Sequence, residues 1–482
     1  MKQRAGAAVI PLALWVAAMA SLALVAAWAL PYAGPALDFA HDGLVAAHIS
    51  DRSLTPVPVI QNAPGAWPLL LGYLAAFACA CAAYAAVLRA KLDARWVWAA
   101  FVLGAGAALA VPFFPTSDPY AYALYALEAG PLRLDPYVAH AALGTSLPWA
   151  APLLAIFPDP AAYVRHCNYG PLAVFAYAAL ALPLQHAPLA VFLIAERCFG
   201  ALCVAATGLL LARSAPGEEG VKRLARYVLH PLVLTEFVAF AHGDALMLAL
   251  LAAAFLCWRR EAFGLCAAAC VAALATRSVA ALGLAASFVA LARVRPRALP
   301  RAFGGALLAA LALGGASFVA FGEVSLGGAP AFNRFAAPLS YLAALFGVDA
   351  VAATVFAQAA LGAALVVSIL RRWWLRRDGS LAWLSFAALA GLPAIYPHYL
   401  GWVAGVAALA PGRRFELAAR VATFAAPLWY VARMNLIAPP QPSATAYGVA
   451  LALTWGSVVL ALLAGASAVA RNDGETSLRP AG

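Results

Sequence analysis

The sequence predicts an all-α polytopic membrane protein. Of its 482 residues, 65% are hydrophobic and only 11% are charged, whereas a soluble chain is about half apolar. The apolar segments run for about 15 to 25 residues without the alternation of a transmembrane strand, so they predict helices rather than a barrel. Basic residues gather in short clusters between these segments, which is the pattern of cytoplasmic loops.

The formal net charge of +11 arises from those clusters, so it indicates orientation in a membrane and not nucleic-acid binding. The eight cysteines lie almost wholly within apolar segments, with Cys167 alone in a predicted outer loop, so no disulfide framework is expected. The apolar run to Leu30 favours an uncleaved anchor. Together with the basic balance, the alanine-rich composition favours a bacterial inner (cytoplasmic) membrane.

The first spans fix the side on which Asp118 lies. Lys2 and Arg4 place the N-terminus in the cytoplasm, so a span over 7–30 leads outward. Spans at 67–89 and 96–114 follow, separated by a basic turn. Asp118, just after the third span, is therefore extracytoplasmic.

Residues 115–168 are too polar and too rich in proline to span, but their short apolar runs suit helices lying in the interface. The next stretch, 169–213, is too long for one crossing, yet the basic cluster that follows must be cytoplasmic. We therefore expect an interfacial or re-entrant helix over 169–185 and then a span at 188–212.

The later apolar segments alternate with basic clusters. Expected spans lie at 227–241, 244–258, 262–276 and 278–293. One further span ends at about 322 and the next at about 371. Two more lie at 381–396 and 399–411, and a last pair turns at 433–441. About 12 to 14 crossings result, with both termini inside. A single transmembrane domain thus covers 1–470, and 471–482 is expected to be a disordered cytoplasmic tail. Several spans are short for the hydrocarbon core, so their outer ends should line a dish beside Asp118.

Asp118 has two interpretations. In Ser117-Asp118-Pro119 the carboxylate is placed to cap a helix, with Pro119 at the first helical position. Tyr122 and Tyr125 follow at i+4 and i+7, on the same side of that helix. A carboxylate flanked by aromatic rings also suits removal of a proton from a sugar hydroxyl while the ring is stacked. Both interpretations stay open.

Other polar breaks fall on the predicted outer side. His242 and Asp244 interrupt two spans, either as functional groups or, for Asp244, as a helix cap. Arg277 stands alone between two short spans, so it needs a phosphate, or Asp244 or Glu236, as its partner. The remaining candidates are aromatic or polar outer turns that an interfacial belt or an ordinary loop would also explain: Tyr169-Gly170-Pro171, Tyr396-Pro397-His398-Tyr399 and Asn333-Arg334. Glu196 and Arg197, inside a span, are expected to satisfy one another.

Several of these segments together resemble a known family. The runs Ser117-Asp118-Pro119-Tyr120-Ala121-Tyr122 and Leu134-Asp135-Pro136-Tyr137 resemble the first-loop motif of bacterial polyprenyl-phosphate-mannose-dependent α-1,6-mannosyltransferases, integral-membrane enzymes of the GT-C class. Similar elements follow in order between residues 113 and 411: Tyr169-Gly170-Pro171-Leu172, His230-Pro231-Leu232, Ala241-His242-Gly243-Asp244-Ala245-Leu246-Met247 and His398-Tyr399-Leu400-Gly401-Trp402.

The resemblance implies a GT-C-like helical bundle with an extracytoplasmic catalytic loop at 115–168. It implies transfer of a sugar, with mannose favoured, from a polyprenyl phosphate to an acceptor hydroxyl, with Asp118 as general base. Donor-phosphate binding would fall to Arg277, His242 and Arg334, and substrate binding to Tyr122, Asp135, Tyr137, Tyr169, Asp244, His398 and Tyr399. The chain departs from the family at Gly243, where Asn is expected, at Arg277, where Lys-Pro is common, and at Pro397-His398, which replaces an aromatic residue. These departures bear on the donor sugar.

No cofactor is required beyond the lipid-linked sugar, although a divalent cation shared by Asp118 and Asp135 is an open alternative. The implied partners are the lipid bilayer, the polyprenyl-phosphate sugar and a glycan or glycolipid acceptor. The sequence contains no zinc-ligand spacing, phosphate-binding glycine loop or nucleophile elbow, so nucleotide chemistry has no support. Alternatives are a transporter or flippase of lipid-linked sugars, a GT-C enzyme using another lipid-linked sugar, and a non-catalytic scaffold.

Overall fold

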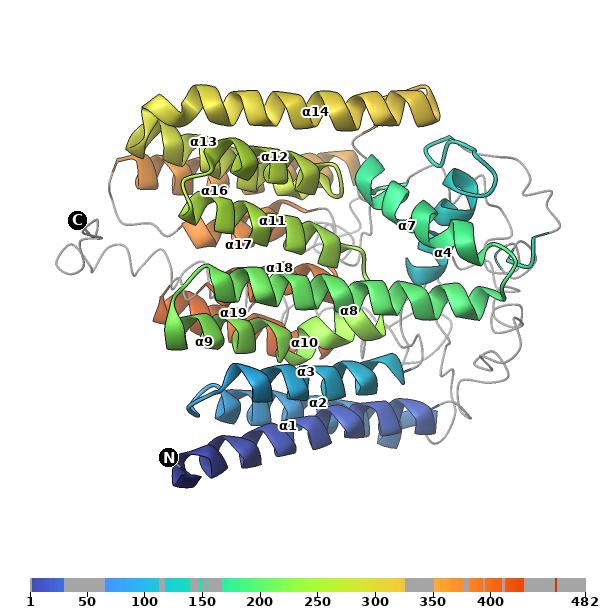
Figure 1. Ribbon diagram of the computed structural model, residues 1–482, viewed down its shortest axis with the longest axis vertical. Helices are drawn as coiled ribbons and strands as arrows, with labels where there is room; N and C mark the ends of the chain where they lie inside the picture. Colours follow the sequence, from blue (N-terminus) through green and yellow to red (C-terminus); the bar gives the residue numbers. More distant parts are fainter. Residues whose placement is uncertain are drawn as a thin grey trace.

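The described part of the chain is entirely helical. The computed structural model describes residues 2–29, 66–111, 118–138, 147–149, 153, 167–325, 351–375, 381–392, 395–409, 412–428 and 456, and within these ranges no strand occurs. Apolar helices pack side by side with their axes roughly aligned (Figure 1). This agrees with the all-α class that the apolar segments predict.

Three N-terminal helices form one side of the bundle. They are α1 (Lys2–Ala29), α2 (Ala66–Val87) and α3 (Ala94–Leu109), and they match the first three predicted spans. Trp15 of α1 is fully buried because it lies over Gly104 of α3, where a Cβ atom would overlap the indole ring. The close contact of the two helices therefore depends on a glycine opposite a large ring.

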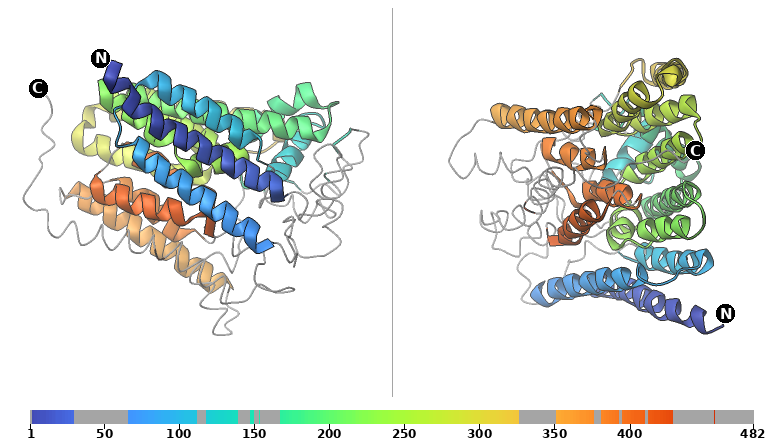
Figure 2. Two further views of the ribbon diagram at one scale, coloured as in Figure 1. Left: turned by 90° about the horizontal axis from the view of Figure 1, so that it is seen from below. Right: turned by 90° about the vertical axis from the view of Figure 1, so that its left-hand side faces the viewer.

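Two further sets of helices form layers behind one another (Figure 2). One layer contains α8 (Leu189–Arg213), α11 (Asp244–Arg259), α12 (Phe263–Leu274), α13 (Ala281–Val294) and α14 (Leu299–Phe321). The other contains α16 (Val351–Trp374), α17 (Leu384–Gly391), α18 (Pro397–Ala407) and α19 (Arg413–Ala425). Short 3₁₀ turns, Ser278–Ala280, Pro296–Ala298 and Leu381–Trp383, connect some of them.

Within the described residues, two helical segments are long and apolar enough to cross a membrane. These are Leu189–Arg213 and Pro296–Phe321, of 25 and 26 residues. At about 1.5 Å per residue, each exceeds the roughly 30 Å of a hydrocarbon core. Other apolar helices are shorter, among them α3, α7 (Pro171–Leu184) and α12, which have 16, 14 and 12 residues.

The prediction of a continuous span over 227–241 was wrong. An amphipathic helix, α9 (Gly217–Val228), ends there, and the chain then forms the single turn α10 (Pro231–Leu234) and the π-helix η3 (Thr235–Ala239). Pro231 explains the break, because proline lacks an N–H and disfavours helical geometry in the residue before it.

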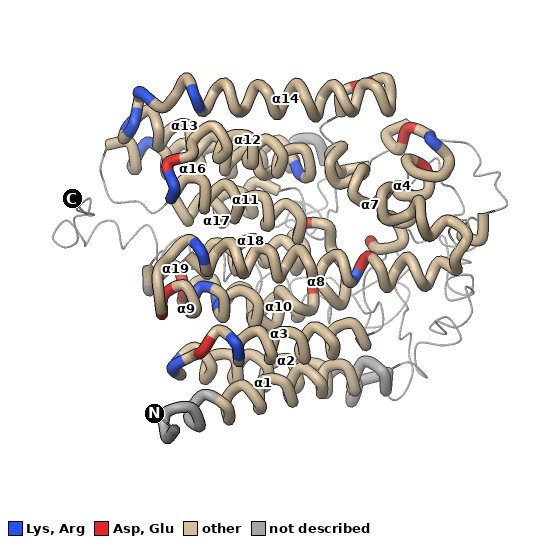
Figure 3. The backbone as a smooth tube through the Cα atoms, in the orientation of Figure 1, with Lys and Arg blue, Asp and Glu red and all other residues tan. Residues whose placement is uncertain are grey.

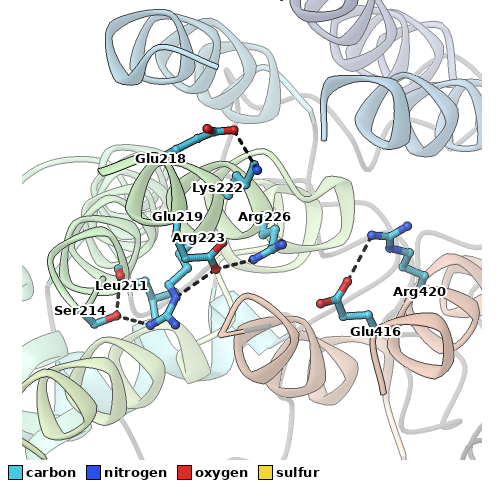
Figure 4. Close-up of polar contacts among 9 residues, drawn as sticks. All are labelled: Leu211, Ser214, Glu218, Glu219, Lys222, Arg223, Arg226, Glu416 and Arg420. Atoms are coloured by element: carbon cyan, nitrogen blue, oxygen red, sulfur yellow. Dashed lines mark hydrogen bonds and ion pairs between the residues drawn. The ribbon is translucent and has the colours of Figure 1, made fainter. Parts of the chain in front are cut away.

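Ion pairs stabilise the polar face of α9 (Figure 4). Lys222 lies 2.9 Å from Glu218, and Glu219 accepts from both Arg223 and Arg226. Pairs at i and i+4 are typical of a solvated helix face. The basic cluster that marks a cytoplasmic loop in the sequence is therefore largely paired within one helix.

Charge and helix placement distinguish the two ends of the bundle. Lys and Arg gather at one end (Figure 3), as the alternation of basic clusters predicts. At the opposite end lie α4 (Asp118–Ala129) and α7 (Pro171–Leu184), which pack on one another. The helix expected over 169–185 is thus present and separate from α8, while its position in a membrane interface stays a prediction. The predictions for residues 30–65, for Arg334 and for the chain after 428, apart from residue 456, lie outside the described residues.

Candidate functional site

The end of the bundle that carries α4 and α7 contains a cluster of polar and aromatic side chains. Four helices, α4, α7, α11 and α18, begin at this cluster, and α12 ends there. The structure brings together these predicted site residues: Asp118, Tyr122, Tyr169, His242, Asp244, Arg277, His398 and Tyr399. Residues far apart in the sequence therefore share one site.

His242 lies between two carboxylates. Its Nδ1 is 3.2 Å from Oδ2 of Asp118, and its Nε2 is 3.3 Å from Oε2 of Glu236. Both contacts are ion pairs by distance, although their angles depart from those of good hydrogen bonds. The side chains of His242 and Glu236 are each 1% exposed, whereas that of Asp118 is 37% exposed. Asp118 is therefore the open end of an otherwise buried set.

The protonation of His242 follows from these neighbours. Burial by itself would lower the pKa of the imidazole, but the negative carboxylates of Asp118 and Glu236, 3.2 and 3.3 Å from its nitrogens, outweigh burial and raise the pKa to about 9. At neutral pH the ring is then an imidazolium with an N–H facing each carboxylate.

His398 stacks on His242. The ring centroids are 3.8 Å apart with an interplanar angle of 23°, and Nε2 of His398 lies 3.9 Å from Asp244. The side chain is 5% exposed, and its Nδ1 has no hydrogen-bond partner among the described residues. The second histidine thus covers one face of the first and excludes water from it.

Arg277 is held by a carboxylate and two aromatic rings. Its Nε lies 3.3 Å from Oδ1 of Asp244, and one terminal nitrogen donates to the Tyr399 hydroxyl at 2.9 Å. The guanidinium also lies over the ring of Tyr169, 4.3 Å from its centroid. The sequence offers Asp244 and Glu236 as protein partners of Arg277. In the structure Asp244 lies beside Arg277, whereas Glu236 lies beside His242.

Backbone pairing explains the Tyr169-Gly170-Pro171 segment. The Gly170 N–H donates to Thr276 O at 3.0 Å, and the Leu172 N–H donates to Ala275 O at 2.9 Å. A Cβ atom at position 170 would overlap the Ala275 carbonyl. The glycine therefore allows the two chains to meet, and this contact sets Tyr169 beside Arg277.

Tyr122 packs α4 against two other tyrosines of the cluster, Tyr169 and Tyr177. Its hydroxyl lies 2.6 Å from that of Tyr169, and its ring stacks on Tyr177 at 5.1 Å with an interplanar angle of 9°. A Cβ atom at Gly243 would collide with the Tyr177 hydroxyl and press on the Tyr169 ring. The two tyrosines thus leave no room for a side chain at position 243.

Asp135 and Tyr137 lie at the edge of this cluster. The Tyr137 hydroxyl donates to Tyr169 O at 3.0 Å, and Asp135 accepts from the Tyr137 N–H at 2.9 Å. Asp135 therefore makes a local turn contact. Burial raises the pKa of the Glu128 carboxyl to about 8, and the negative charge of nearby Asp135 adds to this effect.

Asp118, His242 and His398 together offer donor atoms within 4.8 Å of one another, the range of a metal site. Their arrangement does not suit one. An imidazole binds a metal through a lone pair in the ring plane. An ion shared by two rings stacked at 3.8 Å would lie between their planes, and both nitrogens of His242 already face carboxylates. A divalent cation shared with Asp135 stays a prediction.

Sequence reasoning missed the role of Glu236 and the contribution of Tyr177. Glu236 lies six residues before His242, within the π-helix η3, and the irregular backbone that follows brings the two side chains together. The expectation that Glu196 and Arg197 satisfy one another also fails in part. Arg197 donates to Leu109 O at 2.7 Å, and within the described ranges neither carboxylate oxygen of Glu196 has a hydrogen-bond partner.

No family model matches the chain, and neither a curated protein nor a solved structure shows significant similarity to it. The site is therefore interpreted from its own geometry.

Proposed function

We propose that this protein is a polytopic membrane glycosyltransferase. In this proposal it transfers a sugar, most simply mannose, from a polyprenyl-phosphate donor to an acceptor hydroxyl on the extracytoplasmic face of a bacterial inner membrane. Asp118 is the general base. The wider frame of the proposal is the apolar composition, the two helices long enough to span and the gathering of basic residues at the end of the bundle away from the site.

The exposure of Asp118 is the observation that carries the proposal. Its side chain is 37% exposed, while its neighbours His242, Asp244 and Arg277 are at most 8% exposed. A general base must reach a proton on a bound substrate, and buried groups behind it can hold its position. Among the described residues of the cluster, Asp118 is the carboxylate that meets this requirement.

The proposed reaction is a single displacement. The acceptor O–H bond breaks as its proton passes to a carboxylate oxygen of Asp118, and the acceptor oxygen forms a bond to the anomeric carbon. The bond from that carbon to the phosphate oxygen breaks, and its electron pair stays on the polyprenyl phosphate. The leaving group is already a phosphate, so it needs no strong acid.

Positive electrostatic elements support a phosphate beside Asp118. The N-termini of α4, α7, α11 and α18 meet at the cluster, and helix N-termini favour anions. Among the described residues, Arg277 directs Nε toward Asp244 and Nη2 toward Tyr399, and neither contact uses Nη1. One guanidinium nitrogen therefore remains to bind a phosphate oxygen.

The test compares sugar transfer in purified membranes carrying the wild type and Asp118→Asn at matched expression, with radiolabelled polyprenyl-phosphate mannose as donor. Asn still caps a helix but cannot accept a proton, so transfer should fall by at least about 100-fold. Asp93→Asn is the matched control. Asp93 lies in the basic loop between α2 and α3 and caps α3 by accepting a hydrogen bond from the backbone N–H of Arg95. That variant should retain full transfer.

Transfer by Asp118→Asn at the wild-type rate would show that Asp118 is only a helix cap. Absence of transfer in the wild type, with mannose and with a panel of other lipid-linked sugars, would remove the proposed function itself.

A further inference from the structure

We infer that Glu236 is a positioning residue that acts through His242 to hold and orient the Asp118 carboxylate. The inference rests on the proposed function of Asp118. It assigns a role to an acid that is 1% exposed, and it makes Asp118, His242 and Glu236 one unit.

The three side chains form a line from the surface inward. Asp118 is 37% exposed, His242 and Glu236 are each 1% exposed, and the two contacts of the imidazole are 3.2 and 3.3 Å long. Each ring nitrogen faces one carboxylate, so the ring cannot turn without losing both contacts. An anchored imidazolium limits the positions open to the exposed carboxylate.

The backbone between Glu236 and His242 is unusual in two respects. Residues Thr235–Ala239 form a π-helix, and Ala241 has a positive φ of 51°. π-Helical turns occur frequently at functional sites, and the left-handed conformation is unfavourable for alanine because of its Cβ atom. The backbone N–H of His242 donates to the backbone carbonyl of Glu236 at 3.0 Å, which closes this segment into a loop. The surrounding fold therefore stabilises an unfavourable conformation that brings the two side chains together.

Four elements around His242 contribute a charged or titratable group. Asp118 comes from α4, Glu236 from η3, Asp244 from α11 and His398 from α18, and Arg277 is paired with Asp244. Asp244 is thus compensated by Arg277, whereas the structure places Asp118 and Glu236 on the two nitrogens of His242. These two carboxylates make His242 an imidazolium, with a pKa raised to about 9 against the effect of burial.

The pH dependence follows directly. A histidine with a raised pKa is charged below that pKa, so the unit is intact at neutral pH and is lost as pH rises through about 9. Removing the Glu236 charge should lower the pKa of His242 by about 1–3 units. The alkaline limb of transfer should then move to lower pH by the same amount.

The deciding experiment is ¹⁵N NMR of histidine-labelled protein, purified into lipid nanodiscs and titrated from pH 5 to pH 10. The chain contains eight histidines, and the His242 signal is the one that disappears in His242→Gln. We expect His242 to titrate near pH 9 in the wild type and at least about one unit lower in Glu236→Gln. Glu128→Gln is the matched control, since Glu128 is also fully buried but lies away from His242, and it should leave the titration unchanged.

Asp118→Asn provides a second test if Glu236→Gln does not fold, because it removes the other, exposed carboxylate and should also lower the titration point of His242. Titration of wild-type His242 near 6.5, or a titration point that does not move in these variants, would overturn the inference. Transfer measured across the same pH range separates the two proposals. A His242 that titrates as expected in a protein without transfer supports the three-residue unit and counts against the proposed function alone.

Discussion

Arg277 illustrates how much one residue can depend on its neighbours. The arginine is 7% exposed and lies among Asp244, Tyr399 and Tyr169. A buried charge is stabilised only when it is paired, so the arginine and Asp244 depend on one another whatever else they bind. The ion pair does not decide whether the arginine also contacts a donor phosphate.

A double-mutant cycle separates these two roles. Arg277→Gln leaves Asp244 as an unpaired buried carboxylate and should lower the free energy of unfolding by about 3–5 kcal/mol. The double variant Arg277→Gln/Asp244→Asn removes both charges and should recover most of this loss in thermal unfolding of the purified protein. If Arg277 also binds the donor phosphate, the double variant folds without regaining transfer. If the double variant is no more stable than Arg277→Gln alone, Asp244 is not the main partner of Arg277.

At the scale of elements, the site depends on the place where α8 touches the π-helix. Gly200 of α8 lies so close to η3 that a Cβ atom would overlap the carbonyl oxygen of Phe237, the residue after Glu236. The absence of a side chain at position 200 therefore sets where Glu236 lies. In the sequence, Gly200 is only one of two glycines in this apolar segment.

Gly200→Ala should displace η3 and with it Glu236. We expect a loss of stability of about 1–3 kcal/mol, from overpacking, together with reduced transfer. Gly106→Ala on α3 is the matched control, because a Cβ atom there meets nothing within 4 Å. That variant should keep full transfer and be no less stable, since alanine is the better helix former. Equal behaviour of the two variants in thermal unfolding and transfer would argue against the tight contact.

At the scale of the whole molecule, the ends of the bundle differ in composition. Lys and Arg gather at one end (Figure 3), and the cluster around Asp118 lies at the other. A basic end is the one that stays in the cytoplasm, so the site should face outward. The proposed donor and acceptor require the same orientation.

Cysteine labelling tests this orientation. In a variant whose eight native cysteines are replaced, Arg133→Cys, just after α4, should react with a membrane-impermeant maleimide in intact spheroplasts. Arg95→Cys, in the first turn of α3, should react only after lysis. Both positions are exposed in the structure, so access to the reagent differs only through the membrane. Labelling of Arg95→Cys in intact spheroplasts would reverse the proposed topology.

The sequence by itself predicted the all-α class, the first three helices and the separate helix over 169–185. It also predicted that His242, Asp244, Arg277 and His398 interrupt helices at one level. These are local properties, because apolar length, proline and glycine breaks and charge clusters act within a single helix or a single loop. Each can be seen without knowing what packs against it.

Only the tertiary structure decided which side chains meet. In the structure, Arg277 pairs with Asp244, and His242 pairs with Glu236. Tyr177 and Tyr169 lie so close to Gly243 that no side chain fits there. The expected span at 227–241 is divided among α9, α10 and a π-helix. The choice of partner depends on long-range packing, and a π-helical turn shifts the register of every side chain after it. Charges at breaks of similar appearance therefore acquire different roles once the helices pack together.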